Sequence, residues 1–142
     1  MNCREVMTEN PVCCLPTDTV SMAARVMRRE AVGPVPVIND EQSKQLIGIV
    51  TDRDLAIRVV AEARDPNHTM VSDVMTSTIF ACRPEDNLST AIKAMEVNQI
   101  RRIPVVEEDG KIAGIISQGD VAVRIHEPEM TAEMVEEISQ AA

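Results

Sequence analysis

Residues 48–54 read Gly-Ile-Val-Thr-Asp-Arg-Asp, and residues 114–120 read Gly-Ile-Ile-Ser-Gln-Gly-Asp. Other parts of the chain recur in the same way: the Val-Met-Thr of residues 6–8 returns at 74–76, and Pro-Val at 36–37 returns at 104–105. A duplication of this kind predicts two similar units about a pseudo-twofold axis, each too small to bury a good core alone.

Both repeats predict the order strand, helix, strand, strand, helix. Apolar side chains recur at i, i+3, i+4 and i+7 after residues 19 and 87, which is one face of a helix. Proline inside two β-rich runs favours an edge position or the start of a strand. The predicted fold class is therefore α+β, built from two β-α-β-β-α units. In chain order, we expect a strand at 12–14, a helix from Val20 behind the N-cap Thr19, strands at 35–38 and 46–50, a helix at about 52–64, a helix from Leu88, strands at 103–106 and 112–116, and a helix at about 118–126.

Domain boundaries follow from the repeats and from turn-forming residues between them. The predicted divisions are a first unit at 1–64, a linker at 65–70, a second unit at 71–126 and an acidic tail at 127–142, a candidate helix with Met130 and Met134 on one side.

The sequence also predicts a homodimer. The apolar helical stripes include Ala24, Met27 and Met95, which one small module would not fully cover. Such patches usually mark interfaces.

Composition excludes several classes of protein. The chain has 142 residues, of which 44% are hydrophobic, and a net charge of −9. A nucleic-acid binder needs a basic surface and usually stacking aromatics, whereas Phe80 is the one aromatic residue. The sequence lacks an apolar run of the roughly 20 residues that a membrane helix needs, and its start lacks signal-peptide features. We expect a cytoplasmic protein that contacts neither nucleic acid nor membrane.

The four cysteines, Cys3, Cys13, Cys14 and Cys82, form no CxxC pair, so a structural zinc site is not predicted. Two interpretations stay open. The cysteines are small buried apolar residues, or Cys13 and Cys14 form a redox switch.

Enzymatic activity is not predicted. The two histidines, His68 and His126, lie in the linker and beside Pro128. Neither is near a candidate nucleophile, so the sequence shows no triad and no general-base arrangement. An enzyme or redox device is therefore the last of three function classes.

The chemistry concentrates where the last strand of each unit meets its second helix. Thr51 and Ser117 put a hydroxyl, with unpaired backbone N–H groups, at a helix N-terminus, which favours an anion such as phosphate. Three residues later, Asp54 and Asp120 supply a carboxylate that suits the paired hydroxyls of a ribose. Ordinary helix capping is the alternative interpretation of either motif.

The motif closely resembles that of the CBS domain: a strand with Gly, two apolar residues, Thr or Ser, two residues and then Asp, downstream of a helix and a Pro-Val strand. Two such motifs in tandem resemble a Bateman module, over residues from about Arg4 to His126. Residues 51–55 and 64–67 are most similar to those of small stand-alone two-CBS proteins. The resemblance implies a regulatory module that binds AMP, ADP, ATP or a related adenosyl ligand in the clefts between its two domains, with no cofactor required. A CBS scaffold that binds no nucleotide and mediates dimer or partner contacts is the alternative.

The resemblance also implies individual roles. Asp54 and Asp120 would bind ribose, and Thr51 and Ser117 would face phosphate. Each cleft would combine both repeats, so that Asp54 and Arg53 share one site with Arg101 and Arg102. We expect this site to hold phosphorylated ligands more tightly, because guanidinium groups match phosphate. Adenine would lie against Val12, Val32, Gly33 and Pro34 in one repeat and Phe80, Ile100, Arg101 and Arg102 in the other, with Gly33 and Pro34 joining Asp120.

Overall fold

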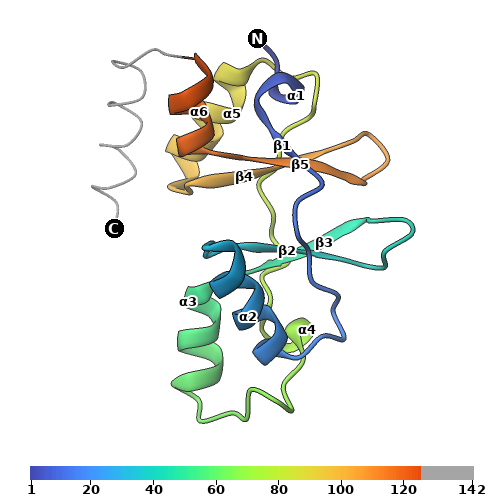
Figure 1. Cartoon of the computed structure of the whole chain (residues 1–142), viewed down its shortest axis with the longest axis vertical. Helices are drawn as coiled ribbons and strands as arrows, with labels where there is room; N and C mark the ends of the chain where they lie inside the picture. The colour runs from blue at the N-terminus through green and yellow to red at the C-terminus, as the bar shows by residue number, and fades with distance from the viewer. Residues whose placement is uncertain (126–142) are drawn as a thin grey trace. The chain divides into compact units, whose positions relative to one another are not determined.

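The computed structural model describes residues 1–125. The predicted tail at 127–142 and His126 lie outside these residues. The fold is mixed α+β, as predicted (Figure 1). Its elements are α1 (Cys3–Val6), β1 (Thr8–Glu9), α2 (Val20–Glu30), β2 (Val35–Ile38), β3 (Leu46–Val50), α3 (Asp52–Leu55), the π-helix η1 (Ala56–Val60), α4 (Val71–Val74), α5 (Leu88–Asn98), β4 (Arg102–Val106), β5 (Ile112–Ser117) and α6 (Gln118–Ile125).

The chain forms two compact units that exchange their leading segments. Unit 1 consists of Met1–Pro11 and the chain from Phe80 onward, and unit 2 consists of Val12–Ile79. The first eleven residues therefore pack with the second repeat. The segment that leads into the second repeat, with α4, packs with the first. The predicted division at 65–70 follows the sequence repeats, whereas the compact units divide the chain at 11–12 and 79–80.

Unit 1 contains a three-stranded antiparallel sheet in the order β1-β5-β4. Thr8 of β1 lies opposite Ile115, and Ile103 of β4 lies opposite Ile116. Helix α1 lies beside α5, α6 and β5 (Figure 1). The core gathers the apolar faces of these elements, and its fully buried members include Val6, Ala91, Met95, Ile103, Val105, Ile116 and Val121.

Unit 2 repeats this plan around the antiparallel pair β2-β3, in which Val35 lies opposite Val50. Thr76 pairs with Ile49 through two backbone hydrogen bonds of 2.8 and 2.9 Å, as β1 pairs with β5 in unit 1. The core members with no exposed surface are Ala23, Val35, Val37, Val50, Val71 and Val74.

The recurring Val-Met-Thr and Gly motifs are explained by one contact in each unit. A Cβ atom built on Gly114 would lie 2.7 Å from the Met7 Sδ and 2.7 Å from the Thr8 carbonyl oxygen. In unit 2, a Cβ atom on Gly48 would lie 2.7 Å from the Met75 Sδ. Each glycine therefore makes room for the methionine of the segment that comes from the other repeat.

Helices α2 and α5 begin and end in the same way. The Thr19 hydroxyl caps α2 by accepting from the Met22 N–H (3.3 Å), which confirms the predicted N-cap. Asn87 caps α5. Both helices end on a left-handed residue, Ala31 with φ 53° and Gln99 with φ 57°. The proline-containing strands β2 and β4 lie at the edges of their sheets, as predicted.

Three predictions about elements were wrong in detail. Residues 12–14 form no strand, because Cys14 makes only one bridge, to Val37. The helix expected at 52–64 winds from α to π at Ala56 and ends at Val60. Of the helical residues expected to stay uncovered, Met27 and Met95 are buried, and only Ala24 is exposed.

Among the described residues, none of the helices has the length and apolar content to cross a membrane.

Candidate ligand-binding site

The two predicted motifs have the same local geometry. In unit 2 the Thr51 hydroxyl accepts from the Asp54 N–H (3.1 Å), and the Asp54 carboxylate accepts from the Thr51 N–H (3.0 Å). In unit 1 the Ser117 hydroxyl accepts from the Asp120 N–H (3.0 Å), and the Asp120 carboxylate accepts from the Ser117 N–H (2.9 Å). Each motif is therefore a reciprocal capping box at a strand-to-helix junction.

The capping boxes leave part of each polar group available to a ligand. A hydroxyl that accepts one hydrogen bond can still donate its own proton, and a carboxylate has a second oxygen. Asp54 uses Oδ2 for the Thr51 N–H, and its side chain is 12% exposed. Hydroxyl donation to a phosphate and acceptance from ribose hydroxyls are thus chemically open at both motifs.

The expectation of unpaired amides at these helix starts was wrong for most of the first turn. The Asp52 N–H donates to the Gly33 carbonyl (3.1 Å), and the Arg53 N–H donates to the Asp52 carboxylate (3.0 Å). In unit 1 the Gln118 N–H donates to the Arg101 carbonyl (3.0 Å). The chain segment before β2 or β4 therefore satisfies amides that the sequence alone left without partners.

The two helix starts differ in charge. A Cβ atom on Gly33 would lie 2.9 Å from the Asp52 Oδ1, so the carboxylate of Asp52 covers this part of the backbone. The equivalent residue in unit 1 is Gln118, which is neutral and whose Oε1 is buried without a hydrogen-bond partner within the described part of the chain. An anion would meet a negative charge at the first motif and none at the corresponding position of the second.

Arg58 is a neighbour of the first motif that sequence reasoning missed. Its Nε lies 3.9 Å from the Asp54 Oδ1, and its Nη1 donates to the Val74 carbonyl (3.1 Å) at the end of α4. The i, i+4 spacing of Asp54 and Arg58 was a signal available in the sequence. Arg58 connects the candidate ribose-binding carboxylate to the segment that unit 2 takes from the second repeat.

The predicted site residues divide between the units. Phe80 and Val12 are 47% and 41% exposed, and Arg53 and Arg101 are also exposed. The expected pairing of Asp54 with Arg101 and Arg102 joins residues of different units and stays a prediction. Unit 2 holds Val12, Val32, Gly33, Pro34, Thr51, Arg53 and Asp54, and unit 1 holds Phe80, Ile100, Arg101, Arg102, Ser117 and Asp120.

The surroundings of Cys13 and Cys14, the two cysteines of the redox interpretation, disfavour the reactive thiolate form. Burial raises the pKa of Cys13 to about 11, and burial raises the pKa of Cys14 to about 11 as well. The thiolate is the reactive form of cysteine, so both residues are poor nucleophiles near neutral pH. Within residues 1–125 there is no group of three or more His, Cys, Asp or Glu side chains placed to hold a metal ion.

Comparison with known proteins identifies the family. The CBS domain model matches residues 3–61 and 71–127. The chain therefore belongs to the CBS domain family and carries two copies of the domain.

Relatives of similar length support this assignment. The CBS domain-containing protein YhcV of Bacillus subtilis is 36% identical over 120 residues, which cover 84% of this chain and 82% of YhcV. A crystal structure of CBSX2 in complex with AMP is 27% identical, with a TM-score of 0.76 over 90% of this chain and 98% of CBSX2. A crystal structure of hypoxic response protein I with two coordinated zinc ions is also 27% identical, with a TM-score of 0.79 over 88% of this chain and 99% of that one.

Proposed function

We propose that this protein is a regulatory module that senses adenine nucleotides through its two CBS motifs. The observation that carries the proposal is the identical capping geometry of the two motifs, each with a hydroxyl and a carboxylate at the N-terminus of a helix. The complex of CBSX2 with AMP supports the choice of ligand. The proposed role is regulatory, and cytoplasmic location and the absence of enzymatic activity remain predictions.

Each part of an adenine nucleotide has a proposed partner. Asp54 or Asp120 accepts hydrogen bonds from the ribose hydroxyls through the oxygen that its capping box leaves available. Thr51 or Ser117 donates its hydroxyl proton to a phosphate. Val12 and Phe80, which are large and partly exposed, offer apolar surface to adenine. Hydrogen bonds to charged groups contribute about 1.5–3 kcal/mol each, so loss of one aspartate should weaken binding about tenfold or more.

The absorption spectrum provides a sensitive first test. The chain has no Trp or Tyr, so bound nucleotide would dominate its near-ultraviolet spectrum. Protein passed over a desalting column after incubation with AMP should retain a band near 260 nm. Asp54→Ala and Asp120→Ala should each reduce this band. Asp109→Ala, which removes a carboxylate in the β4–β5 turn, should leave it unchanged. Absence of the band at millimolar AMP would count against the proposal.

A second candidate function is a CBS scaffold that binds no nucleotide. The specific observation in its favour is the Asp52 carboxylate, which accepts from the Arg53 N–H at the first helix start and would repel a phosphate there. Exposed apolar side chains on the helices of both units, namely Ile57, Val60, Val97 and Val123, suit contact with a second copy of the chain.

We expect a homodimer in either case. Sedimentation equilibrium should then give twice the chain mass of 15.6 kDa. Val60→Glu or Val97→Glu should shift the equilibrium toward monomer. The two functions separate on ligand binding: a dimer that binds no adenine nucleotide would support the scaffold.

A further inference from the structure

Arg58 stands between the candidate ribose-binding carboxylate and helix α4 in unit 2. Its Nε lies 3.9 Å from the Asp54 Oδ1, and its Nη1 donates to the Val74 carbonyl (3.1 Å). The same nitrogen donates at 3.5 Å to the Met75 carbonyl. One guanidinium group therefore spans a carboxylate that the ligand would contact and the carbonyls at the end of α4.

The Asp54 carboxylate can serve Arg58 and a ligand together. Its Oδ2 accepts from the Thr51 N–H in the capping box (3.0 Å), and its Oδ1 is the oxygen that pairs with Arg58. A carboxylate oxygen has two lone pairs, so Oδ1 can accept from a ribose hydroxyl and remain paired. The Arg58 side chain is 51% exposed, against 12% for Asp54. The guanidinium is therefore the partner that has freedom left to lose.

The chain that leaves α4 packs on the strand that leads into the motif. The Thr76 N–H donates to the Ile49 carbonyl of β3 (2.8 Å). The Met75 Sδ would lie 2.7 Å from a Cβ atom built on Gly48 of the same strand. The Met75 N–H donates to the Val71 carbonyl (2.9 Å) and closes the turn of α4. Exchange of the Met75 and Thr76 amides with solvent therefore measures how often this segment opens.

A second arginine ties α4 to the stretch of chain after η1. The Arg64 Nη2 lies 3.7 Å from the Asp73 Oδ2, and both side chains are 41% exposed. This ion pair includes no residue of the motif. Arg64 therefore offers a matched control for an arginine that supports α4 without touching the ligand-binding carboxylate.

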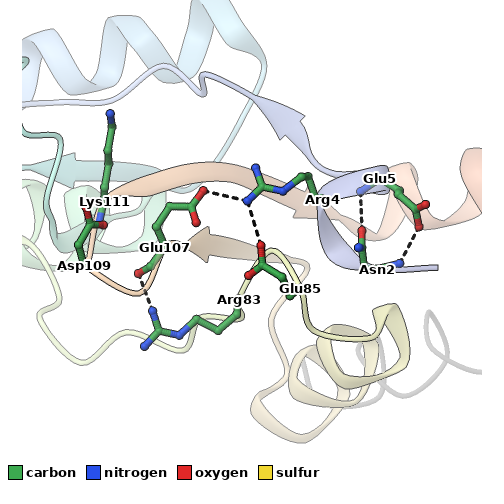
Figure 2. Close-up of polar contacts among 8 residues, drawn as sticks. All are labelled: Asn2, Arg4, Glu5, Arg83, Glu85, Glu107, Asp109 and Lys111. Carbon is green, nitrogen blue, oxygen red and sulfur yellow. Dashed lines mark hydrogen bonds and ion pairs between the residues drawn. The ribbon is translucent and has the colours of Figure 1, made fainter.

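The equivalent helix of unit 1 is fastened in a different way. Figure 2 shows the Arg4 guanidinium of α1 between two carboxylates, with Nη2 3.1 Å from the Glu85 Oε1 and 3.1 Å from the Glu107 Oε1. Glu85 belongs to the turn before α5, and Glu107 follows β4. In the position of α4 that matches Arg4, the chain has Ser72, which carries no charge. The ion pairs of α1 thus run to loops, whereas α4 depends on arginines that follow the motif.

We propose that Arg58 is a positioning residue through which a nucleotide bound at Asp54 holds the end of α4 closed, an inference that rests on the proposed function. A ribose that fixes the Asp54 carboxylate gives Arg58 a fixed partner. Arg58 then loses less side-chain freedom when it binds the Val74 carbonyl, so the end of α4 opens less often. By reciprocity, the contact with α4 raises nucleotide affinity by the same factor.

This coupling extends the effect of the ligand beyond the motif itself. Unit 2 ends at Ile79, shortly after the Thr76 contact with β3, and the chain enters unit 1 at Phe80. A closed segment at 74–76 fixes the place from which the chain leaves unit 2. Ligand binding at Asp54 therefore acts on the connection that leads into unit 1.

Hydrogen exchange of the full chain, measured by nuclear magnetic resonance at the Met75 and Thr76 amides, tests the proposal. Saturating AMP should slow exchange of both amides about fivefold, the lower end of the usual range for coupled sites. Adenosine should do the same because it carries the same ribose, and adenine, which lacks ribose, should not. Arg58→Ala should abolish the slowing and weaken AMP binding about fivefold, as reciprocity requires.

Two further variants separate coupling from simple support of the fold. Arg64→Ala should speed exchange at Met75 with and without AMP and leave the effect of AMP in place. Arg58→Lys keeps a positive charge beside Asp54 but lacks the planar fork that spans two acceptors. It should bind AMP more tightly than Arg58→Ala and still lose the effect on exchange. Loss of the AMP effect in Arg64→Ala, or its retention in Arg58→Lys, would overturn the role of Arg58.

The binding measurement distinguishes failure of this inference from failure of the proposed function. Saturable AMP binding with unchanged exchange at Met75 and Thr76 would overturn the coupling through Arg58 and leave the nucleotide-sensing function standing. An absence of binding by both AMP and adenosine would overturn both.

Discussion

At the scale of the residue, Asp52 decides how the first motif meets an anion. Its carboxylate accepts from the Arg53 N–H at the helix start, and the equivalent Gln118 carries no charge. Asp52→Asn keeps an acceptor oxygen for Arg53 and removes the charge. We expect affinity for AMP to rise about two- to fivefold, or roughly 0.4–1 kcal/mol, which is the usual size of a charge effect at a helix terminus.

Titration calorimetry with AMP and with adenosine checks this prediction. Affinity for adenosine should not change, because adenosine has no phosphate. Asp109→Asn, which makes the same change in net charge in the β4–β5 turn, is the control. An equal rise in affinity for both variants would show a general charge effect and contradict a role for Asp52 at the site.

Gly114 carries the second prediction at this scale. A methyl group there would approach both the Met7 sulfur and the Thr8 backbone oxygen to 2.7 Å, and backbone cannot move aside as a side chain can. Gly114→Ala should therefore lower the free energy of unfolding by about 1–3 kcal/mol, as overpacking usually does. Gly119→Ala is the matched control, because the nearest atom to its Cβ would be the Ser117 Oγ at 3.6 Å. Urea denaturation measures both, and equal stability of the two variants would disprove the contact.

At the scale of the element, the segment that contains Cys13 and Cys14 makes the free energy of unfolding depend on pH in the alkaline range. Burial raises both pKa values from the ordinary 9.0 to about 11 in the folded protein. Between these limits the unfolded chain binds fewer protons than the folded one, so the free energy of unfolding falls as pH rises from about 9 to about 11. Urea denaturation across this range should show the decline, and Cys13→Ala/Cys14→Ala should reduce its slope. An unchanged slope would place these thiols in contact with solvent.

Elements with a strong local signal were predictable from the sequence, and long-range contacts were not. The helical stripe behind Thr19 and the strands around the two polar loops follow from spacing and capping chemistry. The sequence could not show that Asp52 and Gly33 meet, because their contact depends on the pairing of β2 with β3. For the same reason, the partners of the backbone N–H groups in the first turns of α3 and α6 could not be predicted. The recurrence of Val-Met-Thr was visible, but its packing on the glycine of the other repeat was not.

At the scale of the whole molecule, each compact unit combines segments of both repeats, since Met1–Pro11 pack with the chain from Phe80 onward. The two motifs lie in different units, with Asp54 in unit 2 and Asp120 in unit 1. Ligand binding by both motifs is therefore measured on the full chain.

Calorimetric titration of the full chain with AMP tests most directly whether the two motifs bind adenine nucleotides. We expect saturable binding to the unsubstituted protein, weaker binding to Asp54→Ala and Asp120→Ala singly, and none to the double variant. Circular dichroism of each variant controls for folding. The contrary result would be an absence of heat with AMP, ADP and ATP at millimolar concentration, or binding to the double variant equal to that of the unsubstituted chain.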